Sequence, residues 1–314
     1  EKTSVAMRRP ARRRNPAGGV EPADGASKPG FPMIISVASG KGGTGKTTVA
    51  VNLALAVQDA RPVQFLDCDV EEPNAHFFLR PRIEKRQDVF TLIPEIDGSL
   101  CTSCGQCTRV CAYNAVAVVQ GVGLVFSELC HGCGACALFC PEKAIREVGE
   151  RIGVIESGQA GEMDFLQGRL DIGRAMSPPL IRALKKRIKR GQTIIIDAPP
   201  GTSCPMVESV KRSDFCLLVT EPTPFGLHDL ELAAATAKEM KIPRGVVINR
   251  ATPGDGDGKI RDFCAAEGIP VMMAIPFDRR IAEAYSRGRT ILQALPDFRG
   301  AFLELFEDIE RAVR

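Results

Sequence analysis

The stretch from Gly40 to Thr47 has the residue types and the spacing that hold phosphate groups. It reads Gly-x-x-x-x-Gly-Lys-Thr between an apolar run and a helix-forming segment, which is the context of a phosphate-binding loop. The glycines let backbone N–H groups approach phosphate oxygens, Lys46 neutralises their charge, and Thr47 is placed to hold Mg²⁺. We therefore expect a nucleotide and Mg²⁺ at a site that includes Gly40, Lys41, Gly42, Gly43, Thr44, Gly45, Lys46, Thr47 and Thr48.

Eight of the twelve cysteines fall into two runs with the same internal spacing. Each run reads Cys-x₂-Cys-x₂-Cys-x₃-Cys, which is the spacing of bacterial ferredoxins. In that arrangement three cysteines of a run bind one [4Fe–4S] cluster, and the fourth binds the other cluster. We therefore expect one cluster on Cys101, Cys104, Cys107 and Cys140, and a second on Cys130, Cys133, Cys136 and Cys111.

Two other interpretations of these cysteines fit the sequence less well. A zinc site needs two Cys-x₂-Cys pairs with a longer spacer, and it leaves the third and fourth cysteine of each run without a role. Stable disulfides are rare in cytosolic chains. His131, next to Cys130, either donates a hydrogen bond toward a cluster or lies exposed in a loop. Cys68, Cys216 and Cys264 lie in apolar segments and are expected to pack in the core.

Apolar runs of strand length alternate with helix-length segments along most of the chain. This alternation predicts an α/β fold with a doubly wound, mainly parallel sheet and helices on both faces. The segment 226–240 is one of the expected helices. The expected strands lie within 33–38, 62–69, 192–201, 214–222, 244–250 and 269–276.

One cysteine-rich segment, 99–148, interrupts this alternation. It consists of two similar halves with glycine turns and no long helix, so we expect a small ferredoxin-like domain inserted into a larger one. The larger, discontinuous domain would comprise residues 31–98 and 149–314 and bind the nucleotide. The segment 1–30 is basic and rich in Pro and Gly, and is expected to form a disordered tail.

The composition limits the class of protein. With 44% apolar residues over 314 positions, the chain can bury a sizeable core. No apolar run of about eighteen residues and no secretory pattern occur, so we expect a cytoplasmic protein without stable membrane insertion. The formal charge is only +3, and no nucleic-acid partner is expected.

The residues that follow Gly40, Lys-Gly-Gly-Thr-Gly-Lys-Thr-Thr, resemble the deviant phosphate-binding motif of the MinD-type ATPases. This family includes ParA, Mrp, nitrogenase iron protein and the arsenical pump ATPase. In it the first lysine, here Lys41, reaches across a dimer interface to the partner's nucleotide. The resemblance implies ATP hydrolysis in a dimer, formed by two copies or with a related ATPase. Taken alone, Lys41 also fits a solvated loop charge.

Further positions match motifs of this family in chain order. Asp69 matches the carboxylate that orients the attacking water, and Asp67 either supports Mg²⁺ or caps the strand end. Asn249 matches the asparagine that binds adenine, and the segment from Pro276 to Asp278 matches one that lines the base. The catalytic residues that the resemblance implies are Lys41, Lys46, Asp69 and Asp197.

From about Met33 onward the chain is similar to MinD-superfamily ATPases that contain an inserted ferredoxin domain. Cys204 follows Asp197 by seven positions, which is the spacing of one of two cysteines that hold a cluster between the subunits of nitrogenase iron protein. The resemblance therefore implies a metal ligand at a dimer axis. By itself, Cys204 also fits a small buried residue beside Pro205.

Three functions would use these parts. The first is an ATP-switched dimer that gates electron transfer through two clusters to a redox partner. The second is an Mrp-like carrier in which ATP controls the delivery of an iron–sulfur or mixed-metal cluster to an apo-metalloprotein. The third is MinD-like positioning, which the acidic polar face of the C-terminal helix opposes at an anionic membrane. Because eight cysteines complete two clusters, the sequence favours electron transfer.

Overall fold

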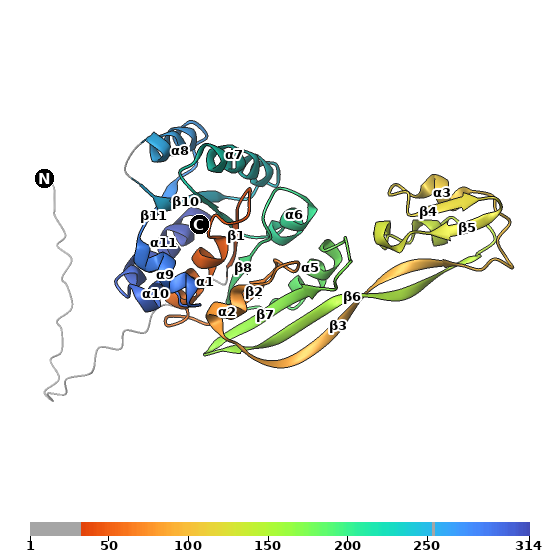
Figure 1. Cartoon of the computed structure of the whole chain (residues 1–314), viewed down its shortest axis with the longest axis horizontal. Coiled ribbons are helices and arrows are strands. Elements are labelled where there is room, and N and C mark those ends of the chain that lie inside the picture. The colour runs from red at the N-terminus through yellow and green to blue at the C-terminus, as the bar shows by residue number, and fades with distance from the viewer. Residues whose placement is uncertain (1–32, 253–254) are drawn as a thin grey trace, which may run out of the picture. The chain divides into compact units, whose positions relative to one another are not determined.

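The computed structural model describes residues 33–252 and 255–314, so the expected tail 1–30 lies outside the described residues. Within the described part, nine strands form one sheet (Figure 1). Their order across the sheet is β11 (Val271–Pro276), β10 (Arg244–Ala251), β9 (Phe215–Thr220), β1 (Ile34–Ala38), β8 (Thr193–Asp197), β2 (Val63–Asp67), β7 (Met163–Leu170), β6 (Ile145–Ala160) and β3 (Arg82–Ile96).

Most of this sheet is parallel, as the sequence predicts. Every neighbouring pair from β11 to β7 is parallel, whereas β6 pairs antiparallel with both β7 and β3. The six expected strands are β1, β2 and β8 to β11; each lies within its expected segment except β10, which extends one residue further, to Ala251. The three remaining strands, β3, β6 and β7, extend one edge and were not expected.

Helices cover both faces of the sheet (Figure 1). Successive residues of a strand point to opposite faces, so Ile35 and Val37 of β1 pack with one set of helices and Ala38 packs with the other. The α-helices of the described residues, including α3 and α4 of the segment 99–148, are α1 (Lys46–Val57), α2 (Ala75–Leu79), α3 (Gln106–Val110), α4 (Ala135–Leu138), α5 (Pro178–Lys185), α6 (Cys204–Val210), α7 (Pro224–Glu239), α8 (Asp255–Ala266), α9 (Arg279–Ser286), α10 (Ile291–Ala294) and α11 (Phe298–Val313).

The C-terminal helix α11 uses its apolar face in the core, as expected from its acidic polar face. Phe302, Phe306 and Ile309 are buried in the same cluster as residues of α1. Arg61 fixes the helix from outside, since its guanidinium lies 4.6 Å from the Phe306 ring and 2.8 Å from Glu310. None of the helices in the described residues is long and apolar enough to span a membrane.

Strands β3 and β6 form a long antiparallel ribbon that ends at the pair Ile96 and Ile145. Residues 97–144 follow this pair, and we call them the cysteine block. The block contains α3, α4, the short 3₁₀ turn Ser127–Leu129, and a hairpin of β4 (Val116–Val119) and β5 (Val122–Val125). Its small apolar cluster includes Cys107, Val116 and Cys136 together with Ile145. The three larger core clusters of the described residues contain no residue of the block.

Candidate functional site

The phosphate-binding loop connects β1 to α1. Gly45 directly precedes α1 with a φ of 94°, which only glycine adopts without strain. A Cβ atom at Gly45 would also lie 2.2 Å from the Asn249 side-chain nitrogen. That nitrogen donates a hydrogen bond of 2.8 Å to the Thr44 carbonyl, so β10 holds the loop in place. The free N–H groups at the start of α1 therefore point into the site, where a phosphate can accept their hydrogen bonds.

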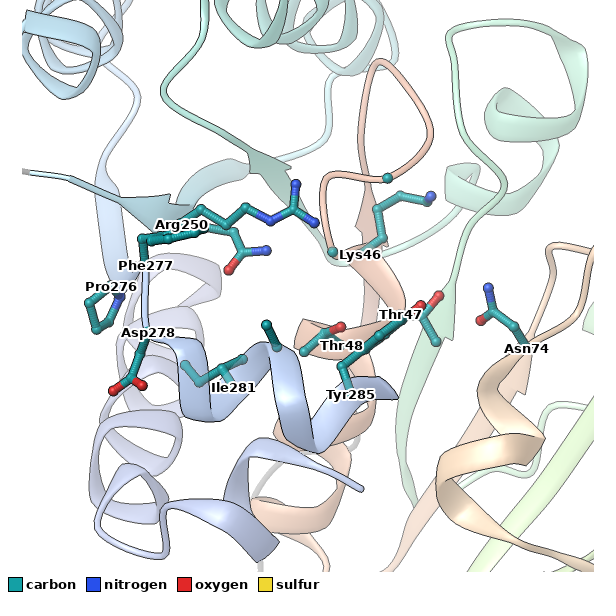
Figure 2. A pocket seen from close by; sticks show the side chains of 14 residues that line it. Lys46, Thr47, Thr48, Asn74, Arg250, Pro276, Phe277, Asp278, Ile281 and Tyr285 are labelled. Atoms are coloured by element: carbon teal, nitrogen blue, oxygen red, sulfur yellow. The ribbon is translucent and has the colours of Figure 1, made fainter. Parts of the chain in front are cut away.

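A cavity of about 400 Å³ opens beside this loop, and we call it the nucleotide cavity. In Figure 2, Lys46 and Thr47 lie on one side of it and Pro276 and Phe277 on the other. The cavity is lined by eight residues that the sequence predicts for the site: Gly43, Gly45, Lys46, Thr47, Thr48, Asn249, Pro276 and Asp278.

Six further residues line the nucleotide cavity. Phe277 belongs to the segment from Pro276 to Asp278 that the resemblance predicts to line the base, whereas the other five were missed from the sequence. Of these, Arg250 follows Asn249, so its neighbour carried a signal. Ile281, Ala282 and Tyr285 share one side of α9, and only the packing of that helix brings them to the cavity. The complete set of additional residues is Asn74, Arg250, Phe277, Ile281, Ala282 and Tyr285.

Lys41 is engaged in an ion pair within its own chain. Its ammonium nitrogen lies 2.8 Å from Glu221 Oε1, and Arg250 lies 2.7 Å from Glu221 Oε2. Burial alone would raise the pKa of Glu221, but the hydrogen bonds and charges of Lys41 and Arg250 hold it below its ordinary value. The other predicted residues that do not line the nucleotide cavity are Gly40, Gly42, Thr44, Asp67, Asp69 and Asp197.

Asp67 and Asp197 lie side by side at the carboxyl ends of β2 and β8, where they are register partners. Both are fully buried. The Asp67 carboxylate accepts hydrogen bonds from the backbone N–H groups of Asp69, Asn74 and Ala75 at 3.0 to 3.1 Å. Asp67 therefore fixes the segment between β2 and α2, and burial together with the charge of Asp197 raises its pKa.

Asp197 differs from Asp67 because its carboxylate oxygens accept no backbone hydrogen bond among the described residues, and only the Thr47 hydroxyl there comes within reach of them. Burial raises the pKa of Asp197 to about 7, although the charge of Lys46 opposes this shift. The pKa of Asp69 is raised to about 6 by burial, again against the charge of Lys46. A buried carboxylate with so few partners is costly, so Asp197 is suited to bind a cation or its water.

The eight cysteines of the cysteine block line two cavities, and each cavity receives four of them. The first is lined by three cysteines of the first run and by the last cysteine of the second run, and the second cavity shows the reverse combination. This is the crossed grouping that the spacing predicts. The two sets are Cys101, Cys104, Cys107 and Cys140, and Cys111, Cys130, Cys133 and Cys136.

The two halves of the cysteine block repeat the same backbone geometry. Gly105 and Gly134 take left-handed conformations before α3 and α4. The last cysteine of each run accepts a hydrogen bond from the backbone N–H four residues later. Cys111 accepts from Ala115 and Cys140 accepts from Ala144, both at 3.3 Å. These two hydrogen bonds hold the sulfurs of Cys111 and Cys140 in matching positions in the two halves.

The remaining cysteines divide into buried and exposed ones. Cys68, Cys216 and Cys264 are buried in core clusters, as expected. Burial raises the pKa of Cys216 to about 12 and that of Cys264 to about 11, so these thiols stay protonated. Cys204 is exposed at the start of α6. His131 stacks on Tyr113 with 3.4 Å between the ring centroids, so it is not a freely solvated loop residue.

Comparison with known proteins places this geometry in a family. A profile described as CobQ/CobB/MinD/ParA nucleotide binding domain matches residues 35–291. An uncharacterised protein of Methanocaldococcus jannaschii is 30% identical over 264 residues, which cover 83% of this chain and 92% of that protein. The iron-sulfur cluster carrier protein of Aquifex aeolicus is 27% identical over 301 residues, which cover 91% of this chain and 69% of the carrier.

The fold has a counterpart among solved structures. The septum site-determining protein MinD of Pyrococcus horikoshii, complexed with Mg-ADP, superposes with a TM-score of 0.56 at 20% identity. The match covers 89% of this chain and 96% of that structure. The chain thus belongs to the CobQ/CobB/MinD/ParA nucleotide binding domain family.

Proposed function

We propose that this protein is an ATP-hydrolysing iron–sulfur cluster carrier. The observation that carries the proposal is the similarity to a protein named iron-sulfur cluster carrier along 91% of the chain. The cysteine block adds support, because it offers eight thiols in two groups of four. The sequence alone favoured electron transfer, and the comparisons support the carrier better.

The nucleotide cavity supports the ATPase part of this proposal. Lys46 and the N–H groups at the start of α1 would bind the phosphates, and Asp197 with Thr47 would hold Mg²⁺. Asp69 would orient the attacking water. Lys41 would leave Glu221 and reach the nucleotide of a second subunit when a dimer forms. These roles require positioning and charge neutralisation, which are the main needs of phosphoryl transfer.

The cysteine block fits two [4Fe–4S] clusters better than single metal ions. Among the described residues, no three His, Cys, Asp or Glu side chains converge closely enough to bind one ion. Each thiolate of a [4Fe–4S] cluster instead binds a different iron, so the four sulfurs surround a volume. The crossed grouping of cysteines around two cavities matches that requirement. Clusters bound there would store electrons or be the source of the cluster that is transferred.

Cys204 is the residue that the proposal assigns to the transferred cluster. It is exposed, it begins α6, and it follows the strand end that carries Asp197. In a dimer, two copies of Cys204 would provide two of the ligands, and the acceptor could provide others. An exchangeable site needs such an incomplete, accessible ligand set, whereas the eight cysteines of the block are already grouped in fours.

Anaerobic reconstitution followed by transfer to an apo-ferredoxin tests this proposal. We expect the wild-type protein to deliver a cluster in the presence of Mg·ATP and to retain the iron bound by the cysteine block. Cys204→Ser should abolish delivery while about eight irons per chain remain, and the neighbouring change Ser203→Ala should have no effect. Delivery that persists in Cys204→Ser would refute the assigned role of Cys204.

Electron transfer is the second candidate, and the completeness of both four-cysteine groups favours it. The same reconstituted protein separates the two functions. A carrier loses iron to the acceptor, whereas an electron-transfer protein keeps all its iron and changes its reduction potential when Mg·ATP binds. Redox titration followed by electron paramagnetic resonance, with and without Mg·ATP, measures that difference.

A further inference from the structure

A second large cavity, of about 380 Å³, lies against strands β3, β6 and β7 and the start of α2, and we call it the arginine cavity. None of its lining residues lines the nucleotide cavity or either cysteine-lined cavity. Its polar lining consists of His76, Arg80, Arg86, Glu156, Gln167 and Arg169.

The charges of this lining leave two arginines without a full counter-charge. Arg86 Nε lies 2.8 Å from Glu156 Oε1, so the only carboxylate of the lining is already paired. Arg169 lies 4.0 Å from the same oxygen and donates no hydrogen bond within the described residues. Arg80 forms no ion pair there either. Two guanidinium groups around one cavity, Arg80 without a carboxylate partner among the described residues and Arg169 with only a distant, shared one, favour an anionic ligand.

Three residues of the lining, Gln167, His76 and Glu156, each carry a buried polar atom without a hydrogen-bond partner among the described residues, and His76 lies within reach of Gln167. Gln167 is 5% exposed, and its amide nitrogen donates to Glu156. Its oxygen Oε1 is buried and has no hydrogen-bond partner among the described residues. Burial of an unsatisfied amide oxygen destabilises the empty cavity. A ligand with a hydroxyl or amino group would satisfy this oxygen while its anionic groups bind the arginines.

We propose that the arginine cavity binds a small dianion, either a dicarboxylate or a phosphate, that carries a hydrogen-bond donor. Arg80 and Arg169 bind the anionic groups, and Gln167 accepts a hydrogen bond from the donor. Glu156 keeps Arg86 and Gln167 in position and does not contact the ligand. The proposal is independent of iron–sulfur chemistry and of ATP hydrolysis.

Three probes test the proposal: inorganic phosphate, L-malate and succinate. Malate and succinate are both dicarboxylates, but only malate carries a hydroxyl group. The full chain is first saturated with Mg·AMPPNP, so that the phosphate-binding loop is filled and cannot bind the probes. Isothermal titration calorimetry then measures each affinity. We expect saturable binding of malate or phosphate, and weaker binding of succinate.

Variants assign the binding to the arginine cavity. Arg80→Gln and Arg169→Gln change exposed residues and should each weaken binding about tenfold, since each removes a charge-assisted hydrogen bond to the anion. Gln167→Leu should remove the preference for malate over succinate. Arg151→Gln is the control, because Arg151 pairs with Asp88 on the same ribbon and does not line the cavity.

Two results would overturn the proposal. One is the absence of binding by malate and by phosphate up to high millimolar concentration. The other is binding that Arg80→Gln and Arg169→Gln leave unchanged. A phosphate-only result identifies a phosphate site, and a malate-only result identifies a dicarboxylate site. If Gln167→Leu fails to fold, the two arginine variants still decide the question, because their side chains lie at the surface.

Discussion

At the scale of single residues, the most unusual group is the buried carboxylate of Asp197. Its pKa rises from the ordinary 3.8 to about 7 because of burial, although Lys46 opposes the shift. Between about pH 4 and pH 7 the folded chain therefore holds a proton that the unfolded chain has lost. The free energy of unfolding of the metal-free, nucleotide-free protein should fall as the pH rises through this window.

The variant Asp197→Asn removes this penalty. In urea unfolding with EDTA at pH 8, it should be more stable than wild type by about 2 kcal/mol, and the difference should shrink at pH 5. Asp164→Asn is a control with the opposite expected sign, because Asp164 accepts hydrogen bonds from Lys189, Gln192 and Gln159. That change should destabilise the protein at pH 8. Destabilisation by Asp197→Asn under the same conditions would contradict the argument.

The ion pair of Glu221 leads to a second prediction, on dimerisation. It pairs with Lys41 at 2.8 Å, and the proposed role of Lys41 requires that this pair break when a dimer forms. Glu221→Gln should therefore favour Mg·AMPPNP-dependent dimerisation by about fivefold, since an ion pair near the surface contributes up to about 1 kcal/mol. Sedimentation velocity measures the dimer. Glu267→Gln, which breaks the exposed pair with Lys238, should leave dimerisation unchanged.

At the scale of elements, the cysteine block is separable from the sheet. The ribbon closes at the pair Ile96 and Ile145, and the N–H of Asp97 donates to the Ala144 carbonyl at 2.8 Å. No residue of the block belongs to the three larger core clusters of the described residues. Replacing residues 97–144 with Asn-Gly, which favours a two-residue hairpin turn, should leave a folded protein.

This shortened chain should bind Mg·ATP with unchanged affinity and lose the roughly eight irons per chain that the cysteine block would bind after reconstitution. Circular dichroism checks that the chain is folded, calorimetry measures the Mg·ATP affinity, and an iron determination measures the bound iron. The matched control removes only one group of ligands, by Cys101→Ser together with Cys104→Ser, and should retain about half of the iron. An insoluble product, or loss of Mg·ATP binding, would show that the block contributes to the nucleotide domain.

The sequence predicts some elements and misses others for a physical reason. The six expected strands are parallel and lie between two layers of helices, so they are continuous apolar runs that can be recognised directly in the sequence. Strand β3 is mostly exposed and carries charged residues at successive positions, so it lacks a period-two pattern. Only pairing with β6, far along the chain, makes it a strand.

The same limit applies to the sites. Local motifs predict Lys46, Thr47 and Asn249 because each lies in a short characteristic stretch, and all three line the nucleotide cavity. Tyr285 reaches that cavity only through the packing of α9, and no motif includes it. The arginine cavity is assembled across strands, since Glu156 is the register partner of both Arg86 and Gln167. No window of the sequence contains these residues together.

At the scale of the whole molecule, one row of polar residues crosses the sheet from the arginine cavity to the nucleotide site. Glu156 is paired with Gln167, Gln167 with Asp67, and Asp67 with Asp197 in the register of β6, β7, β2 and β8. A second connection is the segment after β2. Its residue Asn74 lines the nucleotide cavity, and the adjacent Pro73 lines the arginine cavity. The two cavities are therefore connected through neighbouring residues of the sheet and of this segment.

This connection predicts that the two ligands influence each other's affinity. Because Asp67 accepts hydrogen bonds from the N–H groups of Asn74 and Ala75, a dianion that orders the start of α2 also fixes the wall of the nucleotide cavity. We expect malate or phosphate to strengthen Mg·AMPPNP binding by about fivefold, a coupling of about 1 kcal/mol. Linkage requires the same factor when the order of addition is reversed, which calorimetry in both orders measures. Arg169→Gln should abolish the effect. Equal Mg·AMPPNP affinities with and without the dianion would show that the two sites are not coupled.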